Sequence, residues 1–253
     1  MESGLSIGCS GWDYAEWVGR FYPKGTKDRL AHYASIFPIV EIDTSFYRIP
    51  PVAHVQSWAH RTPERFRFTA KMPQEVTHVR RLVGAGEAID EFYRSMEPLV
   101  AAGKLSAVLV QLPPSLAFHA PTVRAFYERL PRRVPVAVEF REPSWRAEAS
   151  WALLEEFGFA ATVVDEPKLP IDLRVTAPFS YVRWHGHGTP LWYDYTFSRG
   201  ELAAWIPRLA ELGGKAPSVL AFFNNHFRGD APMNAGQLRD LLGLPMPSWT
   251  RRL

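Results

Sequence analysis

The stretch Val136-Ala137-Val138-Glu139-Phe140 shows the pattern that decides the fold, a short apolar or β-branched run that ends in polar residues. Runs of this kind are typical of buried strands in a parallel sheet. Seven further runs share the pattern, and they are Leu5–Cys9, Ile39–Asp43, Phe66–Lys71, Ala107–Gln111, Ala161–Asp165, Tyr181–Trp184 and Val219–Phe223. The sequence therefore predicts eight strands.

Amphipathic helical patterns separate most of these strands. In one of them, Ile89, Phe92, Met96 and Leu99 recur at the spacing of a single buried helix face. Another helix is expected to begin at Ser198-Arg199-Gly200-Glu201, which has the form of a capping box. The chain thus alternates between strands and helices.

Eight strands alternating with helices over 253 residues predict a (β/α)8 barrel, so we expect one TIM-barrel-like α/β domain over residues 1–253. The segment from Glu166 to Pro178 contains three prolines and no helical period. We therefore expect the helix between strands six and seven to be missing or reduced. A doubly wound open sheet is the alternative fold. The turn Gly8-Cys9-Ser10-Gly11-Trp12 argues against it, because its glycine spacing is not that of a dinucleotide-binding turn.

Composition and charge exclude several classes of protein. Hydrophobic residues make up 47% of the chain and charged residues 22%, which excludes an intrinsically disordered protein. The single Cys9 excludes a disulfide framework and a cysteine-based zinc cluster. We expect a cytoplasmic protein with no membrane partner, because no stretch is apolar enough to span a bilayer and no leader pattern is present. The formal net charge of +3 is too small to identify a polyanion-binding protein.

Polar side chains at the ends of the predicted strands form the candidate site, because the chemistry of such barrels lies at the carboxyl ends of their strands. In chain order these residues are Ser10 and Trp12, Glu41 and Asp43, Lys71, Gln111, Glu139 and Arg141, Asp165, Arg183 and His185, and Asn224 and Asn225. Strand residues alternate between two faces, so charged residues two positions apart share a face. We expect these pairs to point into the barrel, since burying them against outer helices would be costly.

Four of these residues, Glu41, Lys71, Glu139 and His185, are candidates for catalysis. Glu41 and Glu139 suit paired acid–base work, or they balance nearby cations in a buried ion network. Lys71 is one of six lysines, and Met72-Pro73 ends its strand. It suits a ligand for phosphate or carboxylate, an amine with a lowered pKa, or a partner that neutralises a glutamate.

A divalent metal is compatible with the sequence, which does not require one. His185-Gly186-His187 is the one close histidine pair. Glu41, Glu139 and Asp165 would complete a mixed nitrogen and oxygen site of the kind that zinc or manganese accepts. Histidine is otherwise sparse at the strand ends, where His226 is the other nearby candidate.

Aromatic residues are frequent in the loops that follow the strands, where they either pack on one another or stack on a ligand. The candidate substrate-binding residues are Trp12, Tyr47, Gln111, Arg141, Trp145, Asp165, Arg183, Asn224 and Asn225. Rings combined with Arg141, Arg183 and Lys71 favour a ligand that carries flat rings and negative charge. The expected partner is therefore an anionic small molecule or nucleic acid, and the oligomeric state stays open.

Several motifs are similar to those of the YecE-like proteins, a family of unknown function. They are Ile7-Gly8-Cys9-Ser10-Gly11-Trp12 with Phe21-Tyr22-Pro23, Val40–Arg48, Phe66–Lys71, Gln111-Leu112-Pro113-Pro114, Glu139-Phe140-Arg141 with Ser144-Trp145, Tyr181-Val182-Arg183 with His185-Gly186, and Phe223-Asn224-Asn225 with Asn234-Ala235. Cys9 and Asp43 depart from the residues more usual there. The resemblance implies a TIM-barrel-like fold and no established activity. A likeness in shape to the endonuclease IV class implies a nucleic-acid partner, although this sequence lacks that class's His-rich metal cluster.

The leading functional hypothesis is an enzyme that binds a phosphate-bearing, ring-containing substrate, a nucleic acid or nucleotide, with phosphodiester hydrolysis as one reaction. In it Lys71, Arg141 and Arg183 hold phosphate, and Glu41 or Glu139 transfers protons. One alternative is a carbohydrate or sugar-phosphate hydrolase or isomerase that uses Glu41 and Glu139. Another is a non-catalytic protein that binds single-stranded nucleic acid.

Overall fold

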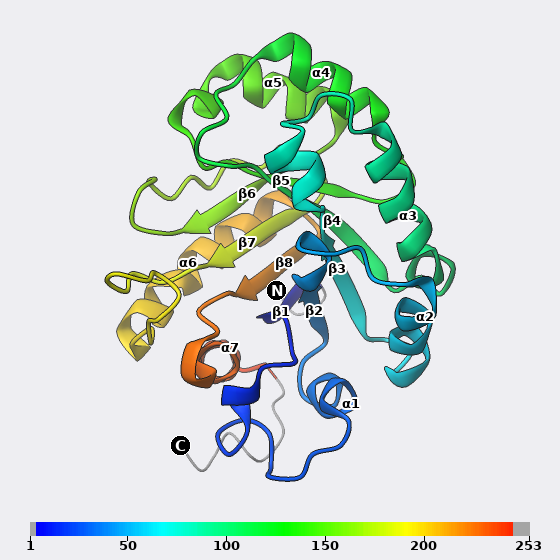
Figure 1. Ribbon diagram of the computed structural model, residues 1–253. Helices are drawn as coiled ribbons and strands as arrows, with labels where there is room; N and C mark the ends of the chain where they lie inside the picture. Colours follow the sequence, from blue (N-terminus) through cyan, green and yellow to red (C-terminus); the bar gives the residue numbers. More distant parts are fainter. Residues whose placement is uncertain (1–3, 245–253) are drawn as a thin grey trace. The chain divides into compact units, whose positions relative to one another are not determined.

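The computed structural model describes residues 4–244, in which eight parallel strands form a closed barrel in the order of the sequence (Figure 1). The strands are β1 (Leu5–Ser10), β2 (Ile39–Ile42), β3 (Arg67–Lys71), β4 (Leu105–Gln111), β5 (Val136–Glu139), β6 (Ala160–Asp165), β7 (Ser180–Trp184) and β8 (Val219–Phe223). The predicted barrel is confirmed, and the doubly wound alternative is wrong because the sheet closes on itself.

Seven α-helices lie along the described chain. They are α1 (Arg29–Ala34), α2 (Val52–Arg61), α3 (Gly86–Ala101), α4 (Ala120–Arg129), α5 (Glu148–Phe157), α6 (Arg199–Lys215) and α7 (Asp230–Leu241). The segment between β6 and β7 contains no helix, as its prolines predicted. The capping box at the start of α6 is present, because the side chains of Ser198 and Glu201 each bond the other's backbone N–H.

Short helical turns follow several strands directly and carry residues of the candidate site. They are η1 (Ala15–Trp17), η2 (Thr44–Phe46), the π-helix η3 (Glu75–Val79), η4 (Pro143–Arg146) and η5 (Phe227–Gly229). No helix of residues 4–244 is both long and apolar enough to cross a membrane.

The chain forms two compact units. The first, called the terminal unit here, comprises residues 4–41, 163–173 and 179–244 of the described chain. The second, called the central unit, comprises residues 42–162 and 174–178. The single domain over residues 1–253 stays a prediction.

Strands β1, β7 and β8 are the frame of the terminal unit. β8 pairs with β1 on one side and with β7 on the other, and Ser10 of β1 lies in register with Glu41 of β2. The ring of Trp184 stacks on Phe223 with centroids 4.4 Å apart. This aromatic core fixes the strand ends from which the polar residues of the unit project.

Strands β3, β4 and β5 are the frame of the central unit, and the register of β4 and β5 places Gln111 opposite Glu139. Helices α2 and α3 lie side by side against this part of the chain (Figure 1). The buried ammonium of Lys104 donates to the carbonyls of Ala59 and Thr62 at 2.6 and 2.7 Å, which closes the carboxyl end of α2. Lys104 thus supports the fold, whereas Lys71 lies at the opposite end of β3.

Candidate functional site

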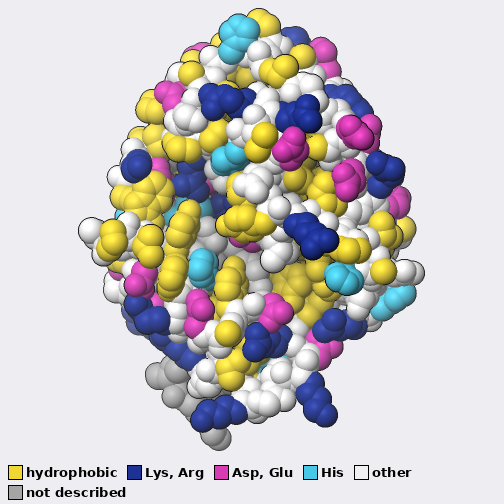
Figure 2. Space-filling view, in the orientation of Figure 1, with side chains coloured by type: hydrophobic (Ala, Val, Ile, Leu, Met, Phe, Trp, Pro, Cys, Tyr) yellow, Lys and Arg dark blue, Asp and Glu magenta, His cyan; other side chains and the backbone are white. Residues whose placement is uncertain are grey.

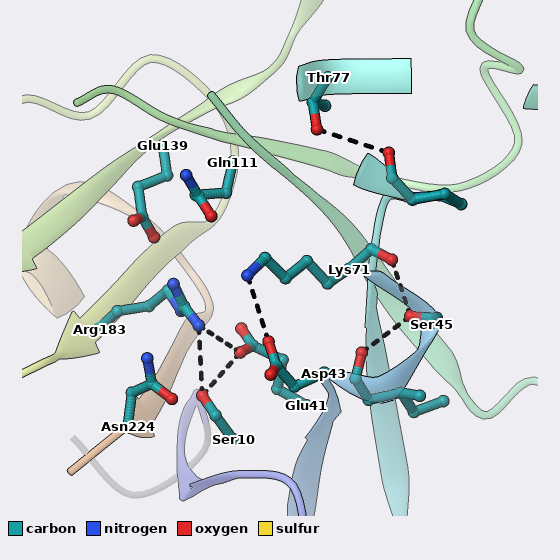
Figure 3. Close-up of polar contacts among 12 residues, drawn as sticks. Ser10, Glu41, Asp43, Ser45, Lys71, Thr77, Gln111, Glu139, Arg183 and Asn224 are labelled. Carbon is teal, nitrogen blue, oxygen red and sulfur yellow. Dashed lines mark hydrogen bonds and ion pairs between the residues drawn. The ribbon is translucent and has the colours of Figure 1, made fainter. Parts of the chain in front are cut away.

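Glu41 is the centre of a buried polar network in the terminal unit (Figure 3). Its Oε1 accepts hydrogen bonds from Ser10 Oγ and from Arg183 Nη2, both at 2.6 Å, and its Oε2 accepts one from the Tyr181 hydroxyl at 2.6 Å. Glu41 and Tyr181 are 0% exposed, and Arg183 is 1% exposed. The buried carboxylate therefore has hydrogen-bond partners on both of its oxygens within the protein.

This network bears on the two interpretations of Glu41 and Arg183, a buried ion network or groups that act on a substrate. Because the guanidinium of Arg183 is buried against Glu41, its charge is already balanced within the protein. The geometry favours the buried ion network for both residues over proton transfer by Glu41 and phosphate binding by Arg183. Those two roles remain predictions.

His185 lies just after β7 and is 0% exposed. Its Nδ1 lies 2.9 Å from the Asn224 side-chain amide, which donates, so Nδ1 is the unprotonated nitrogen of the ring. The ring of Tyr193 packs edge-on against His185 at 5.6 Å. The neighbouring Asn225 donates to the Tyr195 carbonyl and to Asn234 Oδ1, which ties the loop after β7 to α7.

Asp165 ends β6 and is largely buried. Its Oδ1 lies 2.7 Å from His187 Nε2, and its Oδ2 accepts a hydrogen bond from the Trp205 indole at 2.8 Å. His187 keeps 37% of its side chain exposed. The predicted ligand-binding residue Asp165 therefore orients a histidine.

Aromatic rings of the terminal unit stack in the loops after β1, β7 and β8. Tyr14 lies 4.8 Å from His226 at an interplanar angle of 5°, and Tyr193 lies 6.1 Å from the same ring at 16°. Trp12 is half-buried, and its carbonyl accepts a hydrogen bond from Tyr22. Both earlier interpretations of the aromatic loops, mutual packing and ligand stacking, are compatible with partly exposed rings that already contact one another.

Lys71 ends β3 in the central unit, and its side chain is 10% exposed. Its Nζ forms an ion pair with Asp43 (Figure 3), with 3.3 Å between Nζ and Oδ1. The same Nζ lies 4.0 Å from the centre of the Phe46 ring. Ser45 donates to the Lys71 carbonyl at 2.7 Å, which joins η2 to the end of β3. An ammonium has three N–H donors, and Asp43 is the one ion-pair partner of this group among residues 4–244.

His78 lies in η3, the π-helical turn after β3, edge-on to Phe46 at 4.9 Å, and its Nδ1 lies 2.8 Å from the Thr77 hydroxyl. Burial lowers the pKa of His78, and the positive charges of Lys71 and Arg141 lower it further. The imidazole therefore reports a positive potential that two predicted site residues produce together.

Glu139 ends β5, and Arg141 lies two residues further along the chain. The guanidinium of Arg141 forms an ion pair with Glu139 Oε1 through Nη2 and donates from Nε at 2.5 Å. The side chain of Glu139 is 0% exposed and that of Arg141 is 10% exposed. The prediction that these two residues share a face is confirmed. Gln111, which lies opposite Glu139, donates to the Leu112 carbonyl.

The two aromatic candidates of the central unit differ in exposure. Trp145 is buried, donates to the Leu116 carbonyl at 2.7 Å and packs on Phe140. These contacts favour packing within the central unit over ligand binding for Trp145, whose predicted binding role stays a prediction. Tyr47 is 69% exposed, packs edge-on against Phe46 at 5.1 Å, and lines a groove of about 840 Å³ together with Phe46, Arg48 and Arg94.

Comparisons with known proteins agree with this description. A family model described as "Protein of unknown function DUF72" matches residues 6–252. The chain belongs to this family. It is 32% identical over 273 residues to the UPF0759 protein YunF of Bacillus subtilis, covering 95% of each chain. The predicted YecE-like resemblance is confirmed by 26% identity over 233 residues to the UPF0759 protein YecE of Escherichia coli, covering 82% of this chain and 81% of that one.

Solved structures show the same fold. A DUF72 family protein from Thermotoga maritima superposes with a TM-score of 0.87 at 32% identity, covering 95% of this chain and 99% of that one. A D-psicose 3-epimerase superposes with a TM-score of 0.53 at 10% identity over 94% of this chain and 97% of its own. That likeness shows the barrel alone.

The histidine and carboxylate side chains that could bind a metal do not cluster in the described part of this DUF72 protein. Among residues 4–244, no three His, Cys, Asp or Glu side chains form a group that could hold a metal ion. His185 bonds Asn224 and His187 bonds Asp165, so the close histidine pair in the sequence has separate partners.

Two residues of the DUF72 chain, His78 and Tyr181, interact with candidate site residues although the sequence analysis proposed no role for them. Tyr181 resembles a core residue of β7, although it shares a strand face with Arg183. His187 was considered as a metal ligand. His78 follows Lys71 in the helical turn η3, and its position after a strand end was the one available signal.

Proposed function

We propose that this DUF72 protein is an enzyme whose central unit binds a phosphate-bearing, ring-containing substrate of nucleotide size. Lys71 carries the proposal. Its ammonium is largely buried, while Asp43 at 3.3 Å uses one of its three donors. A buried cation with unused donors is costly unless a ligand completes its hydrogen bonding. A phosphate oxygen supplies both the charge and the acceptors.

The second cation strengthens the assignment to an anion. Besides burial, the charges of Lys71 and Arg141 both lower the pKa of His78, so the two cations produce a positive potential at the same imidazole in the central unit. Glu139 and Asp43 balance them in part, which suits a reversible ligand. In this proposal Lys71 and Arg141 hold the phosphate, and Glu139 is the acid–base group beside it.

Phe46 lies between the proposed phosphate ligand Lys71 and the groove that would bind the ring of the substrate. One face of Phe46 carries the Lys71 ammonium, and Phe46 also lines the groove of about 840 Å³ beside the exposed Tyr47. A groove of this volume suits a small-molecule ligand. Tyr47 would stack the ring. The groove itself is lined by Arg48 and Arg94 together with Glu75 and Glu91, so the charge for the phosphate comes from Lys71 and Arg141.

The surface favours a nucleotide or sugar phosphate over a long polyanion. On the face shown in Figure 2, Lys and Arg side chains are interspersed with Asp and Glu among the described residues. A long nucleic acid would need a stripe of positive charge.

The test is a titration of the His78 ring by NMR with four probes: inorganic phosphate, ribose 5-phosphate, adenosine 5′-monophosphate and adenosine. We expect the three phosphate-bearing probes to raise the pKa of His78, because an added negative charge favours the protonated ring. The nucleotide should act at the lowest concentration and adenosine should have no effect. An unchanged pKa with every phosphate would refute the anion site.

Catalysis has its own test. Wild-type protein and the Glu139→Gln variant are incubated with nucleotides and short single-stranded oligonucleotides, and products are followed by phosphorus NMR and denaturing gels. We expect turnover in the wild type and its loss in Glu139→Gln, with the His78 response to phosphate retained. Binding of oligonucleotides with no turnover in the wild type would instead favour the non-catalytic alternative.

A further inference from the structure

A second chemical feature lies wholly within the terminal unit, the pair formed by Asp165 at the end of β6 and His187 in the loop after β7. Asp165 uses both carboxylate oxygens, one toward His187 Nε2 at 2.7 Å and one toward the Trp205 indole at 2.8 Å. An indole N–H can donate but not accept, so Trp205 fixes Oδ2 as a hydrogen-bond acceptor and leaves Oδ1 facing His187. With Oδ1 as the acceptor, His187 donates a hydrogen bond from Nε2, which places the hydrogen of the neutral ring on that nitrogen.

This tautomer leaves Nδ1 of His187 as the basic nitrogen. Nδ1 has no hydrogen-bond partner within the described chain, and 37% of the side chain is exposed. The rings of Tyr195 and Phe197 contact the imidazole edge-on at 5.5 and 6.1 Å. The histidine is thus held from two sides, with a lone pair that can reach solvent or a ligand.

The loop backbone is shaped to hold His187 between two glycines. Gly186 has a φ of +94°, and a Cβ there would lie 2.6 Å from the Trp192 carbonyl oxygen. A Cβ on Gly188 would lie 2.3 Å from the carbonyl oxygens of Leu191 and Asp194. Larger residues cannot occupy either position without moving the loop.

Tyr195 is fixed in turn. Its hydroxyl donates to Glu201, which also accepts from Ser198 in the capping box of α6. The cradle around His187 is therefore tied to the start of a long helix. Such a shell is what keeps a reactive side chain in one orientation.

We propose that Asp165 and His187 form a general acid–base pair that acts on a hydroxyl group of a ring-shaped substrate or on water. His187 Nδ1 takes the proton from the O–H bond as the oxygen forms a bond to the carbonyl carbon of an ester, and Asp165 stabilises the resulting imidazolium. As the bond from that carbon to the leaving oxygen breaks, the same proton passes from Nδ1 to the leaving oxygen, so the pair returns to its starting state. Tyr195 and the half-buried Trp192 beside the loop suit the face of a sugar ring.

The test uses p-nitrophenyl acetate as a probe, whose hydrolysis reports a reactive imidazole without any phosphate. Rates are measured between pH 5 and pH 9 for wild type, His187→Gln, Asp165→Asn and the control His60→Gln, which changes an exposed histidine of α2. We expect His187→Gln to lower the rate about a hundredfold, the lower end of the usual contribution of a general base. Asp165→Asn should lower the rate and move the midpoint of the pH profile to lower pH, because a nearby negative charge favours the protonated ring.

Nitrogen-15 NMR of the histidine rings completes the test, with circular dichroism to confirm that each variant is folded. In the wild type, neutral His187 should be protonated on Nε2, and Asp165→Asn should reduce that preference. The proposal is overturned if His187→Gln hydrolyses the probe as fast as wild type, or if Asp165→Asn leaves both the midpoint and the tautomer unchanged. The assay reads neither His78 nor phosphate, so its failure is distinct from failure of the proposed anion site.

Discussion

Glu41 and Glu139 are equally buried and each is paired with an arginine, yet their surroundings differ. Glu41 is held by side chains from β1 and β7, and its arginine is 1% exposed. Glu139 is paired with Arg141 two residues away in the same segment, and that arginine is 10% exposed. The first arrangement joins distant segments of the terminal unit, whereas the second leaves its cation within reach of a ligand. Burial alone therefore does not distinguish a structural carboxylate from a functional one.

The sharpest test of this contrast replaces each glutamate with its neutral isostere. Glu41→Gln leaves the Arg183 charge buried without its counter-ion, so we expect the free energy of unfolding to fall by about 3–5 kcal/mol. Glu139→Gln should cost about 1 kcal/mol, because Arg141 is partly hydrated and keeps a hydrogen-bond acceptor. Urea unfolding of both variants gives the comparison, and equal losses would show that the two pairs are energetically alike.

A smaller loss is expected when Glu41 keeps its charge and loses one hydroxyl partner. Tyr181→Phe removes the 2.6 Å hydrogen bond to Oε2 and leaves the ring in place. Hydrogen bonds to charged groups contribute about 1.5–3 kcal/mol, so the unfolding free energy should fall by that amount. Tyr127→Phe is the matched control, because the buried Tyr127 hydroxyl has no hydrogen-bond partner within residues 4–244. If the two variants lose the same stability, the network around Glu41 is weaker than its geometry indicates.

The sequence was sufficient for the barrel because its evidence is local. Each strand is a short apolar run. The prolines between Glu166 and Pro178 exclude a helix in that segment whatever the tertiary structure around it. The pairing of Glu139 with Arg141 was equally local, since two residues of one extended segment share a face.

The contacts between site residues were harder to predict from the sequence, because they depend on strand register and on loop geometry. Ser10 reaches Glu41 because β1 and β2 align these two residues, which no single strand specifies. Asp43 was expected to share a face with Glu41, but its backbone is helical, with φ −85° and ψ −25°, so the alternation of a strand does not extend to it. Its partner is Lys71 instead. His78 lies in a short helical turn and His187 in a loop, where a pattern of residue types carries little information about direction.

The functional interpretation of the central unit is sharpened by removing one cation. Lys71→Met should raise the pKa of His78 toward its ordinary value, because one of the two positive charges that depress it is lost. The same change should weaken phosphate binding about tenfold, the effect of losing a charge-assisted contact of roughly 1.4 kcal/mol.

Lys168→Met is the matched control, since this exposed lysine belongs to the terminal unit and its ammonium lies over Trp192. The measurement is the same NMR titration of His78 with inorganic phosphate. A Lys71→Met protein that binds phosphate as well as Lys168→Met would show that Lys71 is a structural ion-pair partner of Asp43.

The smallest expected effect compares two histidines whose pKa values are both lowered, one in each unit. Burial is the cause for His32, whereas burial together with Lys71 and Arg141 is the cause for His78. A folded pKa below the ordinary value of 6.5 means that the unfolded chain binds the proton more readily. The stability due to the neutral ring is therefore present above that pH and is lost as the pH falls below it. His32→Asn and His78→Asn should each flatten the fall in unfolding free energy between pH 8 and pH 5.5.

Salt separates the two histidines. Added sodium chloride screens the charges of Lys71 and Arg141 but does not change burial. The pH dependence that His78 contributes should therefore shrink as salt is raised, while the contribution of His32 should stay nearly constant. Urea unfolding of wild type and both asparagine variants at low and high salt measures this difference. If both contributions respond equally to salt, the positive potential at His78 is too weak to attract a phosphate. The difference between the two units would then be supported only by the comparison of Glu41 with Glu139.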